Sequence, residues 1–145
     1  MNDEITLSPF SVNDAEGSTG RVNGIPRLIL RAEAMLVFIV ALTAFREVDG
    51  SWGTLALVFL VPDLSMMGYL INPRVGSISY NLGHNHGLAL SLGLAGYFGS
   101  HLMLLQLSLI WSAHIGFDRM LGYGLKYGSA FRETHLGRLG KVTAS

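Results

Sequence analysis

Five ionisable side chains interrupt stretches of the sequence that are otherwise apolar, and they are the residues best suited to chemistry. They are Glu33, Asp63, His84, His114 and Asp118. Carboxylate oxygens and imidazole nitrogens bind divalent metal ions and transfer protons. Such groups are costly in apolar surroundings unless they are paired or bind an ion. We therefore expect these side chains to form a functional site.

Three of these residues are predicted to bind a metal ion. Asp63, His84 and His114 would supply oxygen and nitrogen ligands to Zn²⁺ or a similar divalent cation, and His135, the predicted fourth ligand, or Asp118 would complete or support the set. Mixed histidine and carboxylate ligation with one open position acidifies a bound water, as hydrolytic sites require. Asp118 follows His114 by four residues, so on a helix the two side chains share a face. Asp118 is therefore predicted to be a catalytic residue that supports the site.

These residues belong to four segments that are long and apolar enough to be membrane-spanning helices. Their approximate limits are residues 28–45, 52–71, 76–98 and 101–117, and an extension of the fourth segment by about one turn includes Asp118. Half of the residues are hydrophobic, only 14% are charged, and the mean hydropathy is +0.41. About 20 apolar residues cross the roughly 30 Å of membrane hydrocarbon. Because the connections are short, the prediction is an all-α integral membrane protein, an up-down bundle of four transmembrane helices. A soluble bundle, the alternative, would show more regular polar positions.

Basic residues indicate the orientation of this bundle. If the N-terminus is cytoplasmic, all but one of the 10 Lys and Arg residues fall on or near the cytoplasmic side. Arg46 is the exception, and Glu47 and Asp49 accompany it. Cytoplasmic loops of membrane proteins carry such an excess of positive charge. We therefore expect a multi-pass protein of a bacterial plasma membrane, with both termini in the cytoplasm.

The ionisable residues lie at a similar depth in their segments. Asp63 and His84 are each about eight residues from the cytoplasmic end, and Glu33 and His114 about five or six. Polar groups at one level of a bundle can meet in one site, so we expect convergence in the cytoplasmic half of the membrane. Glu33 is predicted to be a second catalytic residue. Its alternative role is to pair with a neighbouring arginine at the membrane surface.

Small residues recur every four positions in the third segment. They are Gly83, Gly87, Ser91 and Ala95. A stripe of this kind lets another helix backbone approach closely within a membrane. It predicts tight packing and a contact through which the chain forms a homo-oligomer. On one continuous helix, His84 would project on the side of the stripe and His86 nearly opposite, so His84 is the predicted inward residue.

The remaining composition excludes several classes of protein. A formal net charge of zero gives no positive field for nucleic acid, and the absence of Cys excludes disulfides and thiolate metal sites. The glycine and serine motifs of nucleotide-binding proteins and α/β-hydrolases are missing. Residues 1–26 are predicted to form a polar, disordered tail. Residues 27–121 form the predicted transmembrane domain, and residues 122–145 a basic cytoplasmic segment.

Four strings in the second half of the sequence carry a resemblance to a known family. They are PDLSMMGYLINPRVG (Pro62–Gly76), YNLGH (Tyr80–His84), IWSAHIGFDRMLGYGLKY (Ile110–Tyr127) and FRETHLG (Phe131–Gly137). The sequence resembles a family of small membrane proteins described as domain of unknown function 4260. No established activity accompanies this family, so the resemblance implies a set of motif residues and not a reaction.

The resemblance adds motif residues that periodicity does not single out. The motif residues are Asp63, Tyr69, Asn81, His84, His114, Asp118, Arg119, Lys126, Thr134 and His135, and Glu33 matches a Glu of the first helix. Tyr69, Asn81, Arg119 and Lys126 are predicted to bind substrate. Arg119 and Lys126 would hold a phosphate-bearing lipid head group at the membrane surface. The alternative role of these two cations is to anchor the bundle on the cytoplasmic side.

The sequence leaves three functions open. The preferred one is a metal-dependent hydrolase that acts on a lipid or lipid-linked substrate in the cytoplasmic half of the bilayer. A carrier of protons or a small solute would also use carboxylates and histidines within the membrane. A non-catalytic membrane subunit would use the same buried polar residues only to specify assembly.

Overall fold

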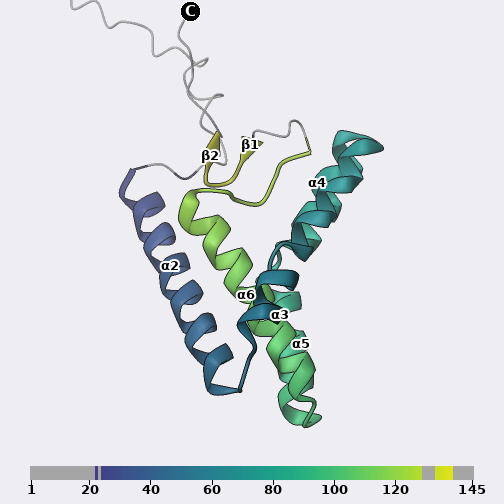
Figure 1. Ribbon diagram of the computed structural model, residues 1–145. Coiled ribbons are helices and arrows are strands. Elements are labelled where there is room, and N and C mark those ends of the chain that lie inside the picture. The colour runs from purple at the N-terminus through teal and green to yellow at the C-terminus, as the bar shows by residue number, and fades with distance from the viewer. Residues whose placement is uncertain (1–21, 23, 129–132, 139–145) are drawn as a thin grey trace, which may run out of the picture.

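The protein consists of helices with one short hairpin at one end (Figure 1). The structure, a computed structural model, describes residue 22, residues 24–128 and residues 133–138. The helices are α2 (Gly24–Glu47), α3 (Trp52–Val58), the 3-10 helix η1 (Val61–Leu70), α4 (Pro73–Gly83), α5 (His86–Phe98) and α6 (Leu102–Leu121), and the strands are β1 (Glu133–Thr134) and β2 (Gly137–Arg138). The predicted helical class is confirmed. Most of the predicted tail, residues 1–26, lies outside the described residues.

Two helical stretches are long and apolar enough to cross a membrane. α2 has a mean hydropathy of 2.1, and the stretch Trp52–Leu70, formed by α3 and η1, has a mean hydropathy of 1.5. Only 17% of the most apolar window of α2 is buried, and none of that of Trp52–Leu70. The apolar side chains of these stretches are therefore mostly not covered by the rest of the described chain, unlike those of a core helix in a soluble protein.

The second and third predicted segments are each broken into two helices. α3 ends at Val58, and η1 begins at Val61 with Pro62 in its first turn. Proline lacks the N–H that would continue the preceding helix. In the third segment Asn85 ends the continuity, because its side chain accepts hydrogen bonds from the backbone N–H groups of Gly87 (2.6 Å) and Leu88 (3.3 Å) and so caps α5. Both breaks lie beside the ionisable residues of their segment.

α6 is the central helix of the molecule. It packs against both α2 and α5, while α4 packs against η1 and the two diverge from α6 toward the hairpin end (Figure 1). At Gly116 of α6 the backbone of α2 is so close that a Cβ atom would lie 2.9 Å from the nitrogen of Phe38. Ser108 of α6 donates a 2.8 Å hydrogen bond to the carbonyl of Ala89 on α5. Small residues therefore set both contacts of α6.

The predicted stripe of small residues does not make the contact between α5 and α6. The buried residues of α5 are Ala89, Gly93 and Gly96, whereas Gly87, Ser91 and Ala95 are exposed. The reason is the break at His84 and Asn85, which starts α5 in a new rotational phase. Gly83, before the break, packs closely against Ser65 and Pro62 of η1, whereas the part of the stripe after the break is not the intramolecular packing face that a continuous helix predicted. Its role in a homo-oligomer stays a prediction.

The segment after α6 is held against both α6 and α4. Gly122 adopts a left-handed conformation (φ 101°), and the N–H of Tyr123 returns to the carbonyl of Asp118 to end the helix. Asn81 of α4 then pairs with the backbone of Lys126 twice, donating to its carbonyl (2.9 Å) and accepting from its N–H (2.8 Å). An isolated bridge joins Lys126 to Thr134 of the hairpin. The described part of the predicted 122–145 segment thus folds over the helix ends.

Candidate metal centre

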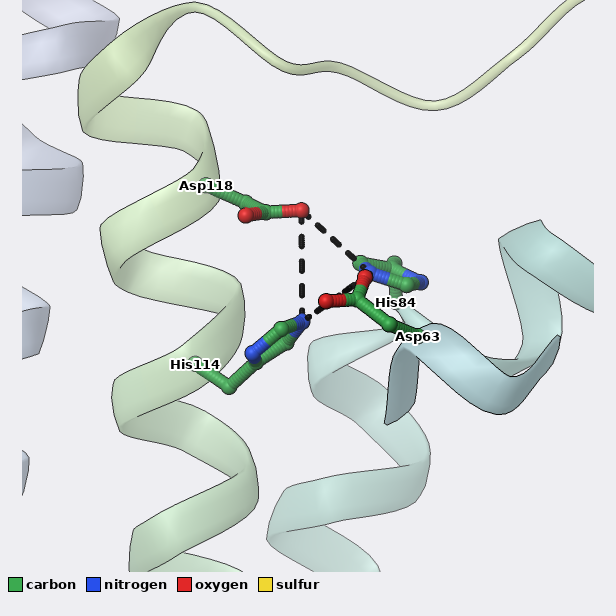
Figure 2. Close-up of side chains that lie close together, drawn as sticks. All are labelled: Asp63, His84, His114 and Asp118. Carbon is green, nitrogen blue, oxygen red and sulfur yellow. Dashed lines mark hydrogen bonds and ion pairs between the residues drawn. The ribbon is translucent and has the colours of Figure 1, made fainter. Parts of the chain in front are cut away.

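Four of the predicted residues meet at the break between α4 and α5. Asp63 comes from the first turn of η1, His84 from the residue that follows α4, and His114 and Asp118 from consecutive turns of α6. One ligand atom of each residue lies within 4.8 Å of those of the other three. Figure 2 shows both imidazoles and both carboxylates directed toward a common centre. Three separate segments therefore build one cluster.

The distances within the cluster fit a single small cation. Nε2 of His84 lies 3.1 Å from Nε2 of His114, 3.4 Å from Oδ1 of Asp63 and 3.3 Å from Oδ2 of Asp118. Nε2 of His114 lies 3.5 Å from the same oxygen of Asp63 and 4.0 Å from that of Asp118. Ligands that bind a tetrahedral Zn²⁺ at roughly 2.0–2.1 Å are about 3.3 Å from one another. Four of these five separations are close to this value, and that between His114 and Asp118 is longer.

A hydrogen bond to the backbone determines which ring nitrogen of His84 carries the hydrogen, and so leaves the nitrogen that faces the cluster as an acceptor. Its Nδ1 lies 2.9 Å from the backbone carbonyl of Tyr80. A carbonyl only accepts, so Nδ1 carries the hydrogen and Nε2 of the neutral ring presents a lone pair. A metal-binding histidine is commonly oriented in this way by a backbone carbonyl. The lone pair of His84 faces two carboxylate oxygens, and a cation at the centre would relieve the resulting repulsion.

The cluster is enclosed on all but one side. The side chains of His84 and His114 are 4% and 1% exposed, that of Asp118 is 16% exposed, and that of Asp63 is 36% exposed. The ring of Phe59 packs edge-on against His114 with centroids 5.2 Å apart. Buried charges must be paired or bind metal. Because Asp63 is the most exposed of the four side chains, access to the cluster from outside is on the side of Asp63.

Tyr80 supports two of the cluster residues, although it is not among the site residues predicted from the sequence. Its ring stacks on that of His84 with centroids 3.8 Å apart, and its hydroxyl donates a 3.2 Å hydrogen bond to Oδ2 of Asp118. The ammonium of Lys126 lies 4.7 Å from the centre of the same ring. The signal that could have identified Tyr80 is its spacing of four residues from His84 within the string YNLGH, which places both on one helical face.

The helix break that presents His84 is fastened to α6 by two further side chains. The indole N–H of Trp111 donates a 2.5 Å hydrogen bond to the carbonyl of Gly83. Nη2 of Arg119 donates a 3.3 Å hydrogen bond to the carbonyl of His84. These carbonyls at the end of α4 lack partners within their own helix, so side chains of α6 satisfy them. Arg119, a predicted substrate-binding residue, thus helps to hold the cluster in place.

The other predicted substrate-binding residues lie near the cluster but face protein groups. Asn81 pairs with the backbone of Lys126, as described above. Lys126 is only 4% exposed, and burial is the main cause that lowers the pKa of its ammonium, while the carboxylates of Asp118 and Asp63 act in the opposite direction. The ring of Tyr69 packs against Gly76 in the contact between η1 and α4. Within the described residues these three side chains support the fold around the cluster.

His135 and Glu33 lie together, but away from the cluster. Nδ1 of His135 accepts a 2.9 Å hydrogen bond from the backbone N–H of Leu125, and burial lowers the pKa of this imidazole. His135 and Glu33 both line a cavity of about 150 Å³ to which His86 and Arg119 also contribute. The structure therefore brings together Asp63, His84 and His114 as predicted. Of the two residues that could complete the set, it places Asp118 in the cluster and His135 in a separate cavity.

Comparison with known proteins identifies a family to which the chain is similar. A family model described as Domain of unknown function (DUF4260) matches residues 27–139. This range covers all four residues of the cluster, as well as the cavity residues Glu33 and His135. No curated protein and no solved structure matches the chain.

Proposed function

The chain belongs to the family Domain of unknown function (DUF4260), as the four strings predicted, and we propose that it is a membrane protein with a catalytic divalent metal ion. The ligands are Asp63, His84, His114 and Asp118. One observation carries the proposal: four ligand atoms from three segments lie within 4.8 Å of one another. The mixture of imidazole and carboxylate favours Zn²⁺ or a similar ion.

A four-span arrangement in the membrane is part of this proposal. The chain direction alternates through α2, α3 with η1, α4 with α5, and α6, so the start of α2 and the end of α6 lie at the same end (Figure 1). Large apolar side chains are exposed on every one of these segments, among them Leu36, Leu57, Leu70, Leu94 and Met103. Soluble proteins seldom expose apolar surface so extensively. Lipid covers these side chains in the proposed arrangement.

The proposed reaction is hydrolysis of a lipid or lipid-linked substrate. A cavity of about 240 Å³ lies beside the cluster, and its lining is almost entirely apolar. Pro62, next to Asp63, and Trp111, one turn before His114, form part of its wall, with Leu92 and Leu107 deeper in the bundle. A hydrocarbon chain fits such a lining, and it would bring the polar linkage of the lipid to the cluster.

The chain contributes enclosure, orientation and a proton acceptor to this reaction. When bound, the metal ion supplies Lewis acidity and lowers the pKa of water. Asp63 is the most exposed carboxylate of the cluster, and it faces the two histidines through Oδ1; its other oxygen would accept a proton from the attacking water. Tyr80 keeps Asp118 oriented through its hydroxyl. Water adds to the acyl or phosphoryl centre, the ester bond breaks, and the departing alcohol takes up a proton.

A second function is favoured by the completeness of the cluster. Structural zinc sites have four protein ligands, whereas catalytic ones keep a position open. If all four side chains bind at once, the ion joins η1 and the end of α4 to α6 and stabilises the assembly without catalysis. The larger exposure of Asp63 is the feature that favours catalysis over this alternative. Hydrolysis of lipid by the metal-loaded protein separates the two functions.

Elemental analysis of the purified protein is the direct test. We expect about one equivalent of Zn²⁺ or a similar ion per chain, and its loss in His84→Ala and in His114→Ala. His101→Ala is the matched control, because His101 is an exposed imidazole at the opposite end of α6 and should retain the metal. A metal content that is far below one equivalent, or that is unchanged in His84→Ala, overturns the proposal.

A further inference from the structure

The cavity that contains Glu33 and His135 is separate from the metal cluster. Its walls come from α2, the start of α5, the last turns of α6 and the hairpin, whereas the cluster is formed by η1, the end of α4 and α6. The four polar side chains that line it are Glu33, His86, Arg119 and His135. A cavity with convergent polar groups and mainly apolar walls is the usual form of a small-molecule site.

The polar groups of this cavity suit a ligand that carries both charges. Arg119 has five N–H donors, and the bond to the carbonyl of His84 comes from one of its terminal nitrogens. His135 accepts a hydrogen bond at Nδ1, so in the neutral ring its single N–H is on Nε2. Donors of this kind bind phosphate. Glu33 carries the charge opposite to that of Arg119, and it would bind a cation such as a primary ammonium.

A larger apolar cavity adjoins the polar one. A cavity of about 500 Å³ runs between α2, α5 and α6, and His86 and Val37 line both cavities. The other residues of its wall include Leu36, Val40 and Leu90, and its lining is almost wholly apolar. The polar cavity is at the end of α6 that we place in the cytoplasm, and the apolar one is deeper in the bundle. This order is that of a membrane lipid, with its head group at the surface and its chain inside.

We propose that these adjoining cavities form a binding site for a phospholipid whose head group carries a phosphate and a primary ammonium. The phosphate binds Arg119 and His135, the ammonium binds Glu33, and one acyl chain occupies the apolar cavity. This inference rests on the membrane placement proposed above and is independent of the metal ion. The bound lipid joins α2 to α6 at the cytoplasmic end.

Lipid retention measured by native mass spectrometry tests this site. The full chain, purified in detergent, is incubated with phosphatidylethanolamine, phosphatidylcholine or phosphatidylglycerol of identical acyl chains. We expect the wild-type protein to retain phosphatidylethanolamine at least about tenfold better than the other two, because only this head group supplies both a phosphate and an N–H donor for Glu33. Equal retention of the three lipids by the wild-type protein overturns the proposal, whatever the variants do.

Two pairs of variants locate the binding. Glu33→Gln should abolish the preference for phosphatidylethanolamine, and Glu47→Gln, at the other end of the same helix, should keep it. Leu90→Trp narrows the apolar cavity and should reduce retention of every lipid, whereas Leu94→Trp, one turn further and outside the cavity lining, should not. Retention that is unchanged in both Glu33→Gln and Leu90→Trp contradicts the assigned site.

Metal content and membrane insertion, measured on the same samples, keep this inference distinct from the proposed function. Glu33→Gln should lose lipid selectivity with an unchanged metal content, since Glu33 is not part of the cluster. Loss of the metal in His84→Ala should leave the lipid preference in place. If the wild-type chain can be washed off membranes without detergent, it is not embedded in the bilayer. That result would overturn the membrane placement and this inference with it, but not the metal site.

Discussion

The Nε2 atoms of His84 and His114 lie 3.1 Å apart, although one residue follows the end of α4 and the other lies within α6. Both imidazoles are almost completely buried. Two lone pairs cannot face each other at this distance without a hydrogen or a cation between them. The carboxylates of Asp63 and Asp118 also reach this point, so a divalent cation, as proposed above, would balance the charge of the whole group.

Tyr80→Phe should weaken metal binding without abolishing it. The variant keeps the ring stacked on His84 but removes the hydroxyl that donates to Asp118. Loss of a group that orients a ligand commonly costs about 10–100-fold in metal affinity, and we expect the lower part of this range. Competition with a chromophoric chelator measures the affinity. Tyr97→Phe, on an exposed face of α5, is the control. An affinity equal to that of the wild type would mean that the hydroxyl does not orient Asp118.

Asn81→Ala should release the segment that follows α6. This variant removes both hydrogen bonds between the Asn81 side chain and the backbone of Lys126. Each such bond contributes about 0.5–1.5 kcal/mol, so local opening becomes markedly more frequent. Hydrogen exchange at the amide of Lys126 should accelerate, while exchange in the middle of α5 stays constant and serves as the internal control. Unchanged exchange at Lys126 would show that other contacts hold the segment.

The sequence predicted which residues of the helices meet, because helical periodicity and depth are regular. Asp63, His84 and His114 were placed at one level by counting along the segments, and the spacing of four residues placed Asp118 on the face of His114. The rotation of His84 was derived from a continuous helix. The cap formed by Asn85 breaks that helix, so the stripe of small residues after it points outward. Asn85 is the N-cap of α5, whose first turn contains Gly87. Such an N-cap is a local signal for a helix start, and it outweighs the four-residue periodicity of the small residues.

His135 shows why residues outside the helices were harder to place. Its chemistry suits a metal ligand, but the fold of a loop depends on contacts that have no period in the sequence. The hairpin puts its imidazole on the backbone N–H of Leu125 and into the cavity with Glu33. Sequence motifs therefore identified His135 as a residue of interest, and only the structure assigned it to a different group of side chains.

Docking of the hairpin should weaken as the pH falls below about 6.5. Burial lowers the pKa of His135 below the 6.5 of the free side chain, so the unfolded segment binds a proton that the docked one does not. The contribution of His135 to docking is therefore complete above the pKa of its imidazole in the unfolded segment, and it is lost as the pH falls toward the lower pKa of the docked imidazole. The protection factor of the Leu125 amide, measured by NMR, reports the effect. His135→Gln should show no such pH dependence. If the protection factor in this variant changes with pH as in the wild type, another titratable group causes the effect.

Gly116→Ala should separate α2 from α6 and lower the thermal stability in detergent. The new Cβ atom would lie 2.9 Å from the nitrogen of Phe38 and 3.0 Å from the carbonyl oxygen of Ala34, and these backbone atoms cannot yield as a side chain can. Overpacking of this kind costs about 1–3 kcal/mol. Gly128→Ala is the control, because its nearest neighbour would be 3.7 Å away. Equal melting temperatures of the two variants would contradict the close approach of the helices.

Single cysteines should report the two sides of the proposed four-span arrangement, since the natural chain has none. Ser51→Cys and His101→Cys lie in the two connections at one end, and Arg74→Cys and Tyr127→Cys at the other, all on exposed residues. A membrane-impermeant maleimide applied to intact bacterial cells should label the first pair only, and the second pair should react after permeabilisation. The cysteine-free parent controls for background labelling. Because α3 with η1 separates Ser51 from Arg74, labelling of both from the outside would show that this stretch does not cross the membrane.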